Sequence, residues 1–395
     1  MKRNIILFND SFPPVIDGVA NVVLNYAKTL GEMGWNCTVV APDAPGTPRG
    51  EEVRVLRYKS LPLPGRYPFR IGLPAVDLKL KKKLDKIEAD IIHVHCPFSS
   101  GWLGLDFAKE RKIPLVGTFH SQYAYDFKNA VQFDFLVKIS LSAVVRFYNK
   151  MDYVWVPNDF AGKALMSYGY NGKYLCMPNG SDFINEDDLA DLRQKGSQFL
   201  NAKQDEFILM FVGRLVKEKN LLLLCETMNE LVKKGTKCRL VFFGEGYYAS
   251  DLKEYTKKHK LDRYIDFMGP LYDRKKLKCA ISRANLFVFP SLYDIAALAL
   301  LEAASLSVPL MLMTGNSIAD KIEHGVNGFL CPNNPHDWAS MVTILMNDKE
   351  LLASVGIKGR KDLVKSWSTI VKEVESFYED YIQQWKGRKK TISNT

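Results

Sequence analysis

Two acidic side chains interrupt an otherwise apolar stretch, FVFPSLYDIAALALLEAASLSVPLML, over residues 287–312. They are Asp294 and Glu302. A helix that is apolar on all sides belongs in a core, and a buried carboxylate there needs a partner. Their spacing puts the acids about 12 Å apart along a helix axis, at about 1.5 Å of rise per residue. That distance is too long for a proton-sharing dyad and suits two contacts along one elongated ligand.

The next candidate residues are cationic. The run FVGRLVKEKN places Gly213 and Arg214 at the end of a predicted strand, and Lys217 and Lys219 just before a helix. A strand end, a glycine and a helix N-terminus form a natural anion site. Arginine can hold a phosphate through two hydrogen bonds, and lysine adds a point charge. The pattern favours a diphosphate; a solvated basic turn is the alternative.

Glycines at other strand–helix junctions could admit phosphates in the same way. Gly244 and Gly246 follow the strand-like CRLVFF, and Gly18 precedes the first long helix. Each signal is weak, because tight turns and ordinary loops also use glycine. No full G-x-G-x-x-G follows the first strand, which counts against a nicotinamide dehydrogenase, the main rival for such a chain.

Histidines stand in or after the predicted strands DIIHVHCP and IPLVGTFH. A lone histidine is usually structural, and His120 is the one we weigh as an active-site residue. His93, His95 and Cys96 suggest a metal, but strand alternation sends His95 and Cys96 to opposite faces. No Asp-x-Asp pair ends a strand, and the EDD at 186–188 is typical of a charge run. The sequence therefore predicts no metal site.

All these residues fall near junctions between strand-like and helix-like runs. The first half contains the strand-like NIILFND, NCTVVAP, DIIHVHCP and IPLVGTFH, and a second array follows with FILMFVGRL, CRLVFFGEG, YIDFMGP, LFVFPS, VPLMLM and GFLCP. Strands alternating with helices imply parallel sheets covered on both faces. We therefore predict an α/β chain of two doubly wound Rossmann-like domains facing a central cleft, with ligands outside the carboxyl ends of the strands.

The expected boundaries follow composition. Residues 1–180 form the first domain, the polar segment 181–206 a linker, and 207–370 the second domain. A helix over 371–387, with Phe377, Tyr381 and Trp385 on one face, crosses back to the first domain. The basic residues 388–395 form a disordered tail.

The bulk composition is that of a globular protein. The chain has 395 residues, of which 47% are hydrophobic and 25% charged, a length that favours two domains. The start, MKRNIILFND, shows no secretory signal, and no apolar run reaches the roughly 18 residues of a membrane span. Seven scattered cysteines are typical of reduced thiols in a cytosol.

The net charge of +10 is concentrated in one segment. Residues 49–86 contain eleven Lys or Arg against four Asp or Glu. The side chains that could form a cationic surface are Arg66, Arg70, Lys79, Lys81, Lys82 and Lys83. Basic residues interleaved with aromatics suit an anionic membrane surface or nucleic acid; a solvated helix face is the alternative.

Taken together, the motifs resemble the retaining nucleotide-sugar glycosyltransferases of the two-Rossmann (GT-B) fold, specifically family four. The resemblance covers nearly the whole chain. It runs through the F-x-P-x-x-x-G element at residues 12–18, then GTFH, VPN, PNG, VGRLVKEKN, FFGEG, FMG and GVNGFL. Each piece is weak, but the ordered set is highly specific. The first domain would then hold the acceptor and the second the nucleotide sugar.

The resemblance implies roles for individual residues. Glu302 would hold the ribose hydroxyls of the donor, and Asp294 would contact the donor sugar. Arg214 and Lys219 would hold the diphosphate as it leaves, and His120 would lie against the transferred sugar. The remaining donor contacts would come from Gly18, Gly213, Gly244, Gly246, Met268, Gly269, Ile295, Ala296, Ala297 and Leu298. The nucleotide sugar, with UDP favoured, is a substrate, and no cofactor or metal is implied.

The chain departs from the family where the helix of the acidic pair begins. The family usually has Glu followed by a pair such as Phe-Gly, whereas this chain has Asp294-Ile295-Ala296-Ala297. The acid is one methylene shorter, and alanine replaces glycine. Donor-sugar choice therefore depends on this segment. An N-cap of the following helix is the alternative role for Asp294.

The acceptor is less clearly indicated. The basic segment and FSSGWLGLDFAKERKIP resemble bacterial diacylglycerol glucosyltransferases, which implies a lipid or lipid-linked glycan acceptor at the cytoplasmic membrane face, and no nucleic acid. A soluble polysaccharide, glycan or protein acceptor is the alternative. A non-catalytic nucleotide-sugar-binding subunit is the rival from another class.

Overall fold

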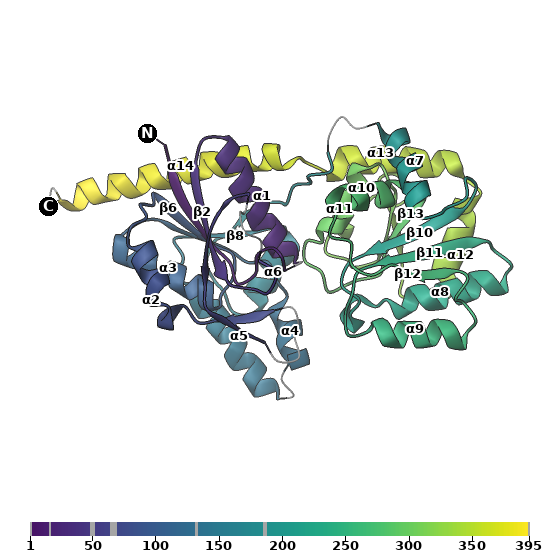
Figure 1. The fold of residues 1–395 in the computed structure, drawn as a ribbon, viewed down its shortest axis with the longest axis horizontal. Coiled ribbons are helices and arrows are strands. Elements are labelled where there is room, and N and C mark those ends of the chain that lie inside the picture. The colour runs from purple at the N-terminus through teal and green to yellow at the C-terminus, as the bar shows by residue number, and fades with distance from the viewer. Residues whose placement is uncertain are drawn as a thin grey trace. The chain divides into compact units, whose positions relative to one another are not determined.

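The structure is a computed structural model that describes residues 2–15, 17–47, 52–63, 69–130, 133–184 and 188–393. The chain forms two compact units. Unit 1 comprises residues 1–179 together with 367–395, and unit 2 comprises residues 180–366. In Figure 1 the colour therefore returns to unit 1 in yellow at the C-terminal helix.

Unit 1 is built on a parallel sheet of seven strands in the order β3-β2-β1-β6-β7-β8-β9, with a small antiparallel pair β4-β5. In chain order its elements are β1 (Asn4–Phe8), α1 (Gly18–Glu32), β2 (Asn36–Pro42), β3 (Arg54–Tyr58), β4 (Ser60–Pro62), β5 (Arg70–Gly72), η1 (Pro74–Val76), α2 (Leu78–Leu84), β6 (Ile91–Val94), α3 (Ser99–Arg111), β7 (Leu115–Thr118), α4 (Tyr123–Ala130), α5 (Asp134–Tyr148), β8 (Tyr153–Val156), α6 (Asp159–Ser167), β9 (Leu175–Cys176) and α14 (Trp367–Ser393).

Unit 2 is built on a parallel sheet of six strands in the order β12-β11-β10-β13-β14-β15. In chain order its elements are α7 (Leu189–Phe199), β10 (Phe207–Val212), η2 (Lys217–Lys219), α8 (Leu222–Lys233), β11 (Cys238–Phe243), α9 (Ala249–Lys258), β12 (Ile265–Phe267), α10 (Arg274–Arg283), β13 (Leu286–Phe289), α11 (Leu298–Ser305), β14 (Leu310–Met313), η3 (Ala319–Lys321), β15 (Phe329–Cys331), α12 (Pro335–Met346) and α13 (Lys349–Leu363).

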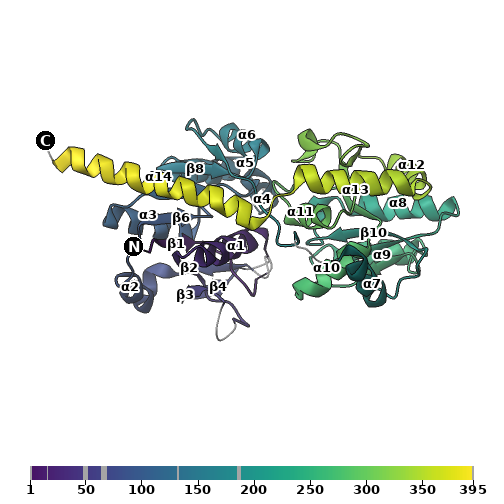
Figure 2. The ribbon, with the colours of Figure 1, turned by 90° about the horizontal axis from the view of Figure 1, so that it is seen from above.

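The central strands are apolar on both faces, as the sequence predicts for covered parallel sheets. All four residues of β13 and of β14 are buried, and so are five of the six in β10. Helices lie on both faces of the unit 2 sheet, as the two views in Figures 1 and 2 show. The α/β fold with two parallel sheets is therefore confirmed.

The segment 181–206, expected as a linker, is not one throughout. Helix α7 forms there, capped by Asp188, whose side chain accepts the backbone N–H of Ala190. It packs so closely on α10 that a Cβ on Gly196 would stand 2.0 Å from the carbonyl oxygen of Cys279. Polar composition was misleading because only one side of this short helix meets the core.

The C-terminal helix is longer than expected. It begins at Trp367 and continues through Ser393, so residues 388–393 are helical rather than a disordered tail. The ring of Tyr378 stacks on Trp155 at 5.4 Å and that of Tyr381 on Tyr153 at 3.4 Å, measured between centroids. These contacts complete the core of unit 1 with residues more than 200 positions away in sequence.

Candidate functional site

The sheet of unit 2 reverses its strand order between β10 and β13, because β10 pairs with β11 on one side and with β13 on the other. Such a switch point is where ligands bind in doubly wound sheets. Gly213 and Arg214 follow β10, and the loop from Ser291 to Asp294 follows β13. The structure thus brings the predicted cations and one of the predicted acids to the same end of neighbouring strands.

Lys219 and Asp294 form an ion pair across this switch point. The Nζ atom of Lys219 donates to Oδ1 of Asp294 at 2.8 Å, and the two side chains are only 8% and 17% exposed. The ammonium also lies 5.4 Å from the ring centroid of Phe289. On the other oxygen, the hydroxyl of Ser291 donates to Oδ2 of Asp294 at 2.7 Å. Both atoms of the carboxylate are therefore held in place.

Asp294 is not the N-cap of α11, so the alternative role considered for it is wrong. The cap position belongs to Ala297, which makes no side-chain cap hydrogen bond. The end of α11 therefore lacks the side-chain acceptor that Ser, Thr, Asp or Asn would supply there. Ile295 is buried, while Ala296, Ala297 and Leu298 are half-buried, so the N-terminal end of α11 is partly exposed to solvent.

Glu302 lies in α11 and has a partner that the sequence did not predict. Nη2 of Arg274 donates to Oε1 of Glu302 at 2.7 Å and to Oδ1 of Asp182 at the same distance. The guanidinium also covers the ring of Phe183, 4.4 Å from its centroid. Burial raises the pKa of Glu302, and the charge and hydrogen bonds of Arg274 oppose that rise. Arg274 therefore favours the ionised form of the buried acid.

Glycines at the ends of β10, β11 and β12 join in a backbone ladder. The N–H of Gly213 donates to the carbonyl of Phe243 at 3.0 Å, and that of Gly244 donates to Gly269 at 2.8 Å. A Cβ on Gly244 would stand 1.9 Å from the carbonyl oxygen of Gly213, and one on Gly246 would stand 2.2 Å from that of Leu215. Gly244 also has φ +137°. Close packing of the loops thus accounts for these glycines.

Met268 and Gly269 follow β12 beside this ladder. The N–H of Met268 donates to the carbonyl of Phe242 at 2.9 Å, while its side chain is exposed. Gly269 has φ +75°, a conformation that favours glycine.

The unit 1 histidines form a column rather than separate sites. The rings of His93 and His95 are 4.0 Å apart, and Nδ1 of His95 lies 3.0 Å from Nε2 of His120. Both nitrogens of His93 are already bonded, at 2.5 Å to the hydroxyl of Tyr378 and 2.6 Å to that of Thr118. Burial lowers the pKa of His120 to about 3. These rings are therefore neutral at ordinary pH.

Gly18 begins α1, and nothing lies within 4 Å of the position of a Cβ there. Its φ is not in the left-handed region. Neither the packing of the chain nor its own backbone conformation therefore requires glycine at this position.

Asp10 is a residue that the sequence reasoning missed. It follows β1 and accepts hydrogen bonds from Sγ of Cys96 at 2.7 Å, from Oγ of Ser99 at 2.5 Å and from the N–H of Ser100 at 2.9 Å. Asp10 thus connects the loop after β6 with the first turn of α3, whose own N-cap Phe98 offers no acceptor. An acid directly after a predicted strand was the available signal. Arg274 and Ser291 offered no comparable signal.

The residues expected to form a cationic surface lie in different surroundings. Lys79, Lys81, Lys82 and Lys83 are exposed on α2, beside Leu78, which is 73% exposed. Arg70 instead reaches across the β4-β5 pair, where its Nε donates to Oγ of Ser60 at 2.6 Å. Arg66 lies outside the described residues, as do residues 49 and 186–187.

Two further observations concern metals and membranes. Within the described part of the chain, no three His, Cys, Asp or Glu side chains gather in a group that could hold a metal ion. Among the same residues, no helix combines the length and apolar character needed to cross a bilayer. All seven cysteines are thiols.

Two protein families match the chain, one on each half. Glycosyltransferase Family 4 matches residues 16–183, and Glycosyl transferases group 1 matches residues 193–362.

Similar proteins of known activity match over most of their length. An alpha-monoglucosyldiacylglycerol synthase of Acholeplasma laidlawii is 24% identical over 96% of this chain and 97% of its own. The sulfoquinovosyl transferase of Arabidopsis thaliana is 26% identical over 99% of this chain and 76% of its own.

Solved structures share the fold over nearly the whole chain. The sucrose-phosphate synthase of Thermosynechococcus elongatus superposes with a TM-score of 0.78 at 19% identity, covering 97% of this chain and all of its own. Anabaena HepE in complex with UDP and glucose superposes with a TM-score of 0.74 at 17% identity, covering 96% and 100%.

Proposed function

This chain is a GT-B glycosyltransferase with family 4 and group 1 domains, and we propose that it moves a hexose from a UDP-sugar to a lipid or lipid-linked glycan. The transfer retains the configuration of the sugar and needs no metal ion. Unit 2 binds the nucleotide sugar and unit 1 the acceptor. The glycolipid synthase among its relatives supports the acceptor class, and HepE with bound UDP supports the nucleotide.

The observation that carries the proposal is the largely buried Lys219–Asp294 pair at the switch point of unit 2, where Arg214 follows β10. A leaving nucleoside diphosphate carries negative charge that must be stabilised as the glycosidic bond breaks. A lysine held within 2.8 Å of a carboxylate has a fixed position before substrate arrives. We assign Arg214 and Lys219 to the diphosphate, and Asp294 to both the lysine and the donor sugar.

The proposed transfer exchanges one C–O bond for another on the same face of the sugar. The bond between the anomeric carbon and the diphosphate oxygen breaks, and a bond from that carbon to the acceptor hydroxyl forms. The hydroxyl proton passes to the departing diphosphate oxygen, so no protein base is required. The His120 ring, kept neutral by burial, then contacts the sugar without adding charge.

The nucleoside end of the donor is assigned to Glu302. The salt bridge from Arg274 engages Oε1 of this buried carboxylate, and we assign the other oxygen to the ribose hydroxyls. Gly18 is assigned to the phosphates. The packing of the chain does not require a glycine there, whereas a ligand that approaches the backbone does require one.

The lipid acceptor places the enzyme at an anionic membrane surface. The exposed Lys79, Lys81, Lys82 and Lys83 of α2, together with exposed Leu78, suit such a surface because they combine cationic and apolar side chains. Arg70 is left out of this surface because it is engaged with Ser60.

A donor panel tests the proposal. Purified protein is incubated with UDP-glucose, UDP-galactose, UDP-N-acetylglucosamine and GDP-mannose, each with a bacterial lipid extract, and products are read by mass spectrometry. We expect a hexosyl-lipid from one UDP-sugar, unchanged by a metal chelator. Wild-type turnover in Lys219→Ala would remove the diphosphate assignment. Binding of UDP without hydrolysis or transfer of any donor would instead indicate a non-catalytic subunit.

A further inference from the structure

We propose that helix α5 of unit 1 carries a second surface for an anionic phospholipid bilayer, separate from the lysines of α2. This deepens the proposed function and rests on its lipid acceptor. The surface is a lengthwise row of side chains, which we name the α5 row: Phe135, Ile139, Ser142, Arg146 and Lys150. Phe135, Ile139, Ser142 and Arg146 lie on one face of the helix because they are three and four residues apart. Lys150 follows in the turn just after the helix ends, and all five side chains are exposed.

The first half of the α5 row is apolar. Phe135 is 60% exposed and Ile139 is 59% exposed, and Phe133, directly before the helix, is 60% exposed. The rings of Phe133 and Phe135 lie 6.1 Å apart. Single exposed apolar residues are ordinary on a protein surface, but a cluster of two phenylalanines and an isoleucine indicates a contact surface.

The opposite face of α5 is firmly built into the unit. Val137, Val144, Phe147 and Tyr148 are buried. The hydroxyl of Tyr148 donates to the carbonyl of Thr118 at 3.0 Å, and Phe147 packs on Trp102 with ring centroids 5.3 Å apart. The exposed side chains are therefore not core residues of a loosely packed helix. They belong to a helix whose orientation is fixed by its other face.

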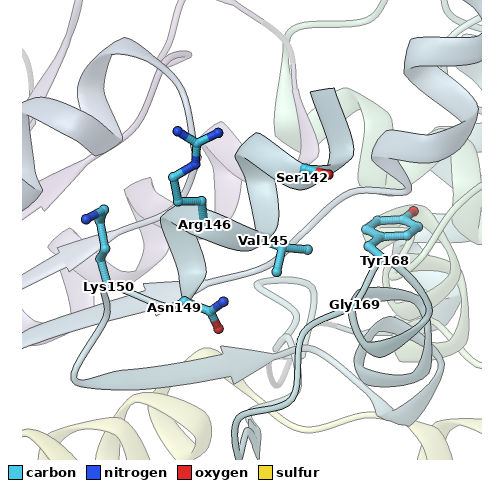
Figure 3. A pocket seen from close by; sticks show the side chains of 7 residues that line it. All are labelled: Ser142, Val145, Arg146, Asn149, Lys150, Tyr168 and Gly169. Atoms are coloured by element: carbon cyan, nitrogen blue, oxygen red, sulfur yellow. The ribbon is translucent and has the colours of Figure 1, made fainter. Parts of the chain in front are cut away.

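The second half of the α5 row is cationic and borders a hollow. The hollow has a volume of about 460 Å³, and Figure 3 shows the side chains that line it. Its lining comprises Ser142, Val145, Arg146, Asn149 and Lys150 from the end of α5 and the turn after it, and Tyr168 and Gly169 from the turn after α6. Neither basic side chain forms an ion pair with any described residue. Two basic groups beside hydroxyl and amide groups suit the phosphate of a lipid head group.

Helix α4 connects the neighbourhood of His120 with the hollow at the end of α5. Helix α4 starts three residues after His120, and its Tyr123 contacts Phe98 edge-on at 5.6 Å and stacks on Phe127 at 5.9 Å, between ring centroids. The hydroxyl of Tyr168, which lines the hollow, accepts the N–H of Ala124 at 3.1 Å. An acceptor held in a bilayer at α5 would thus be presented close to the residue assigned to the sugar.

Charge decides between a bilayer and a second copy of the chain as the occupant. The α5 row contains two cations and no acid, so pairing it with itself across a two-fold axis would bring like charges together. An anionic bilayer accepts both halves, because aromatic and apolar side chains enter the interface while Lys and Arg remain at the phosphates.

Vesicle binding of the full chain tests the proposal with two double variants. One is Phe135→Ser with Ile139→Ser, and the other is Arg146→Gln with Lys150→Gln. Binding is measured by co-sedimentation with phosphatidylcholine vesicles that contain or lack phosphatidylglycerol. We expect the charge variant to bind the anionic vesicles roughly 25-fold more weakly, because each basic residue near such a surface contributes about a fivefold factor. We expect the apolar variant to bind both vesicle types more weakly than the wild type.

Matched controls come from unit 2. Ile344→Ser with Ile357→Ser removes two isoleucines that are 59% and 65% exposed, and Lys257→Gln with Lys258→Gln removes two exposed charges from α9. Both should bind vesicles like the wild type. Wild-type binding by the two α5 variants would overturn the proposal, as would conversion of a wild-type dimer to a monomer by the apolar variant in the absence of vesicles.

UDP titration separates this inference from the proposed function. The α5 variants should bind UDP as the wild type does and melt at the same temperature, since their changed side chains are exposed. If the wild-type protein binds vesicles through α5 but transfers no sugar, the α5 surface is upheld and the proposed function is refuted.

Discussion

At the scale of single residues, the acid at which the sequence departs from the family is held on both of its oxygens. Asp294 accepts from Lys219 on one oxygen and from Ser291 on the other. The shorter acid therefore stands where it can satisfy a nearly buried ammonium. The contact with Lys219 and the proposed contact with the donor would use the same carboxylate.

Replacing Asp294 by Asn should be costly for stability as well as for function. The change leaves the nearly buried ammonium of Lys219 without its counter-charge, and breaking a buried pair costs about 3–5 kcal/mol. Urea unfolding followed by circular dichroism measures the loss of free energy of unfolding. Asp320→Asn, at an exposed acid, serves as the control and should change stability by no more than about 0.5 kcal/mol.

Arg274 should control the pH dependence of nucleotide binding through Glu302. Burial raises the pKa of Glu302 and Arg274 opposes the rise, so Arg274→Gln should raise it further. The carboxylate then protonates at higher pH, and UDP affinity should be lost earlier on acidification. Calorimetric titration of UDP over a series of pH values from neutral to acidic measures the midpoint. Lys275→Gln is the matched control, and an unshifted midpoint in Arg274→Gln would refute the assignment.

At the scale of elements, the loops after β10, β11 and β12 are held to one another by backbone contacts. Gly213, Gly244 and Gly269 take part through the ladder of N–H donors, and Gly244 and Gly246 admit neighbouring carbonyls that a Cβ would exclude. This explains how loops from three strands keep a common edge beside Arg214. The first sheet uses a side chain for the comparable connection, because Asp10 joins the loops after β1 and β6.

Two glycine substitutions should distinguish a glycine required by packing from a glycine required by ligand binding. Gly244→Ala would place a Cβ 1.9 Å from a backbone carbonyl and force a residue to φ +137°, so it should lower the free energy of unfolding by about 1–3 kcal/mol or more. Gly18→Ala meets nothing within 4 Å and should leave stability unchanged while lowering turnover. Thermal unfolding and donor hydrolysis distinguish the two, and wild-type turnover in Gly18→Ala would remove its phosphate assignment.

At the scale of the whole molecule, unit 1 is completed by the end of the chain. Tyr378 is fully buried against Trp155 and donates to or accepts from His93 at 2.5 Å, and Nε1 of Trp35 donates to Glu375 at 2.7 Å. Unit 2, by contrast, draws its core from one continuous stretch, residues 180–366. The two units therefore differ in how they depend on the C-terminus.

Truncation should affect the two units unequally. A chain ending at Ser366 exposes Trp155 and leaves His93 without its Tyr378 partner, so unit 1 should lose its packed core. Limited proteolysis should cut within residues 1–179, while UDP binding by unit 2 persists. A chain ending at Lys386 keeps Tyr378 and Trp385 and should resist proteolysis. Equal resistance of both chains would contradict this account.

The sequence determined that the sheets are parallel and where most of their strands lie: all six in the second sheet, but only β1, β2, β6 and β7 of the seven in the first. Runs such as FILMFV and LFVF are apolar throughout, and a strand buried on both faces permits nothing else. The identities of Arg214, Lys219, Asp294 and Glu302 followed from strand ends and from an ordered set of motifs. Local composition was sufficient to find these residues because the chemical type of the side chain, the direction of the backbone and the burial of the preceding strand all point to the same few positions.

Only the tertiary structure decided which partners those residues have. Lys219 and Asp294 are 75 positions apart, Arg274 and Glu302 are 28 apart, and His93 and Tyr378 are 285 apart. No local pattern encodes such pairs, because each depends on which strand lies beside which and on how far a side chain reaches. The same reason explains why the sequence analysis did not predict helix α7 or the exposed row on α5. Which face of a helix is buried depends on the element that packs against it, and that element lies elsewhere in the chain.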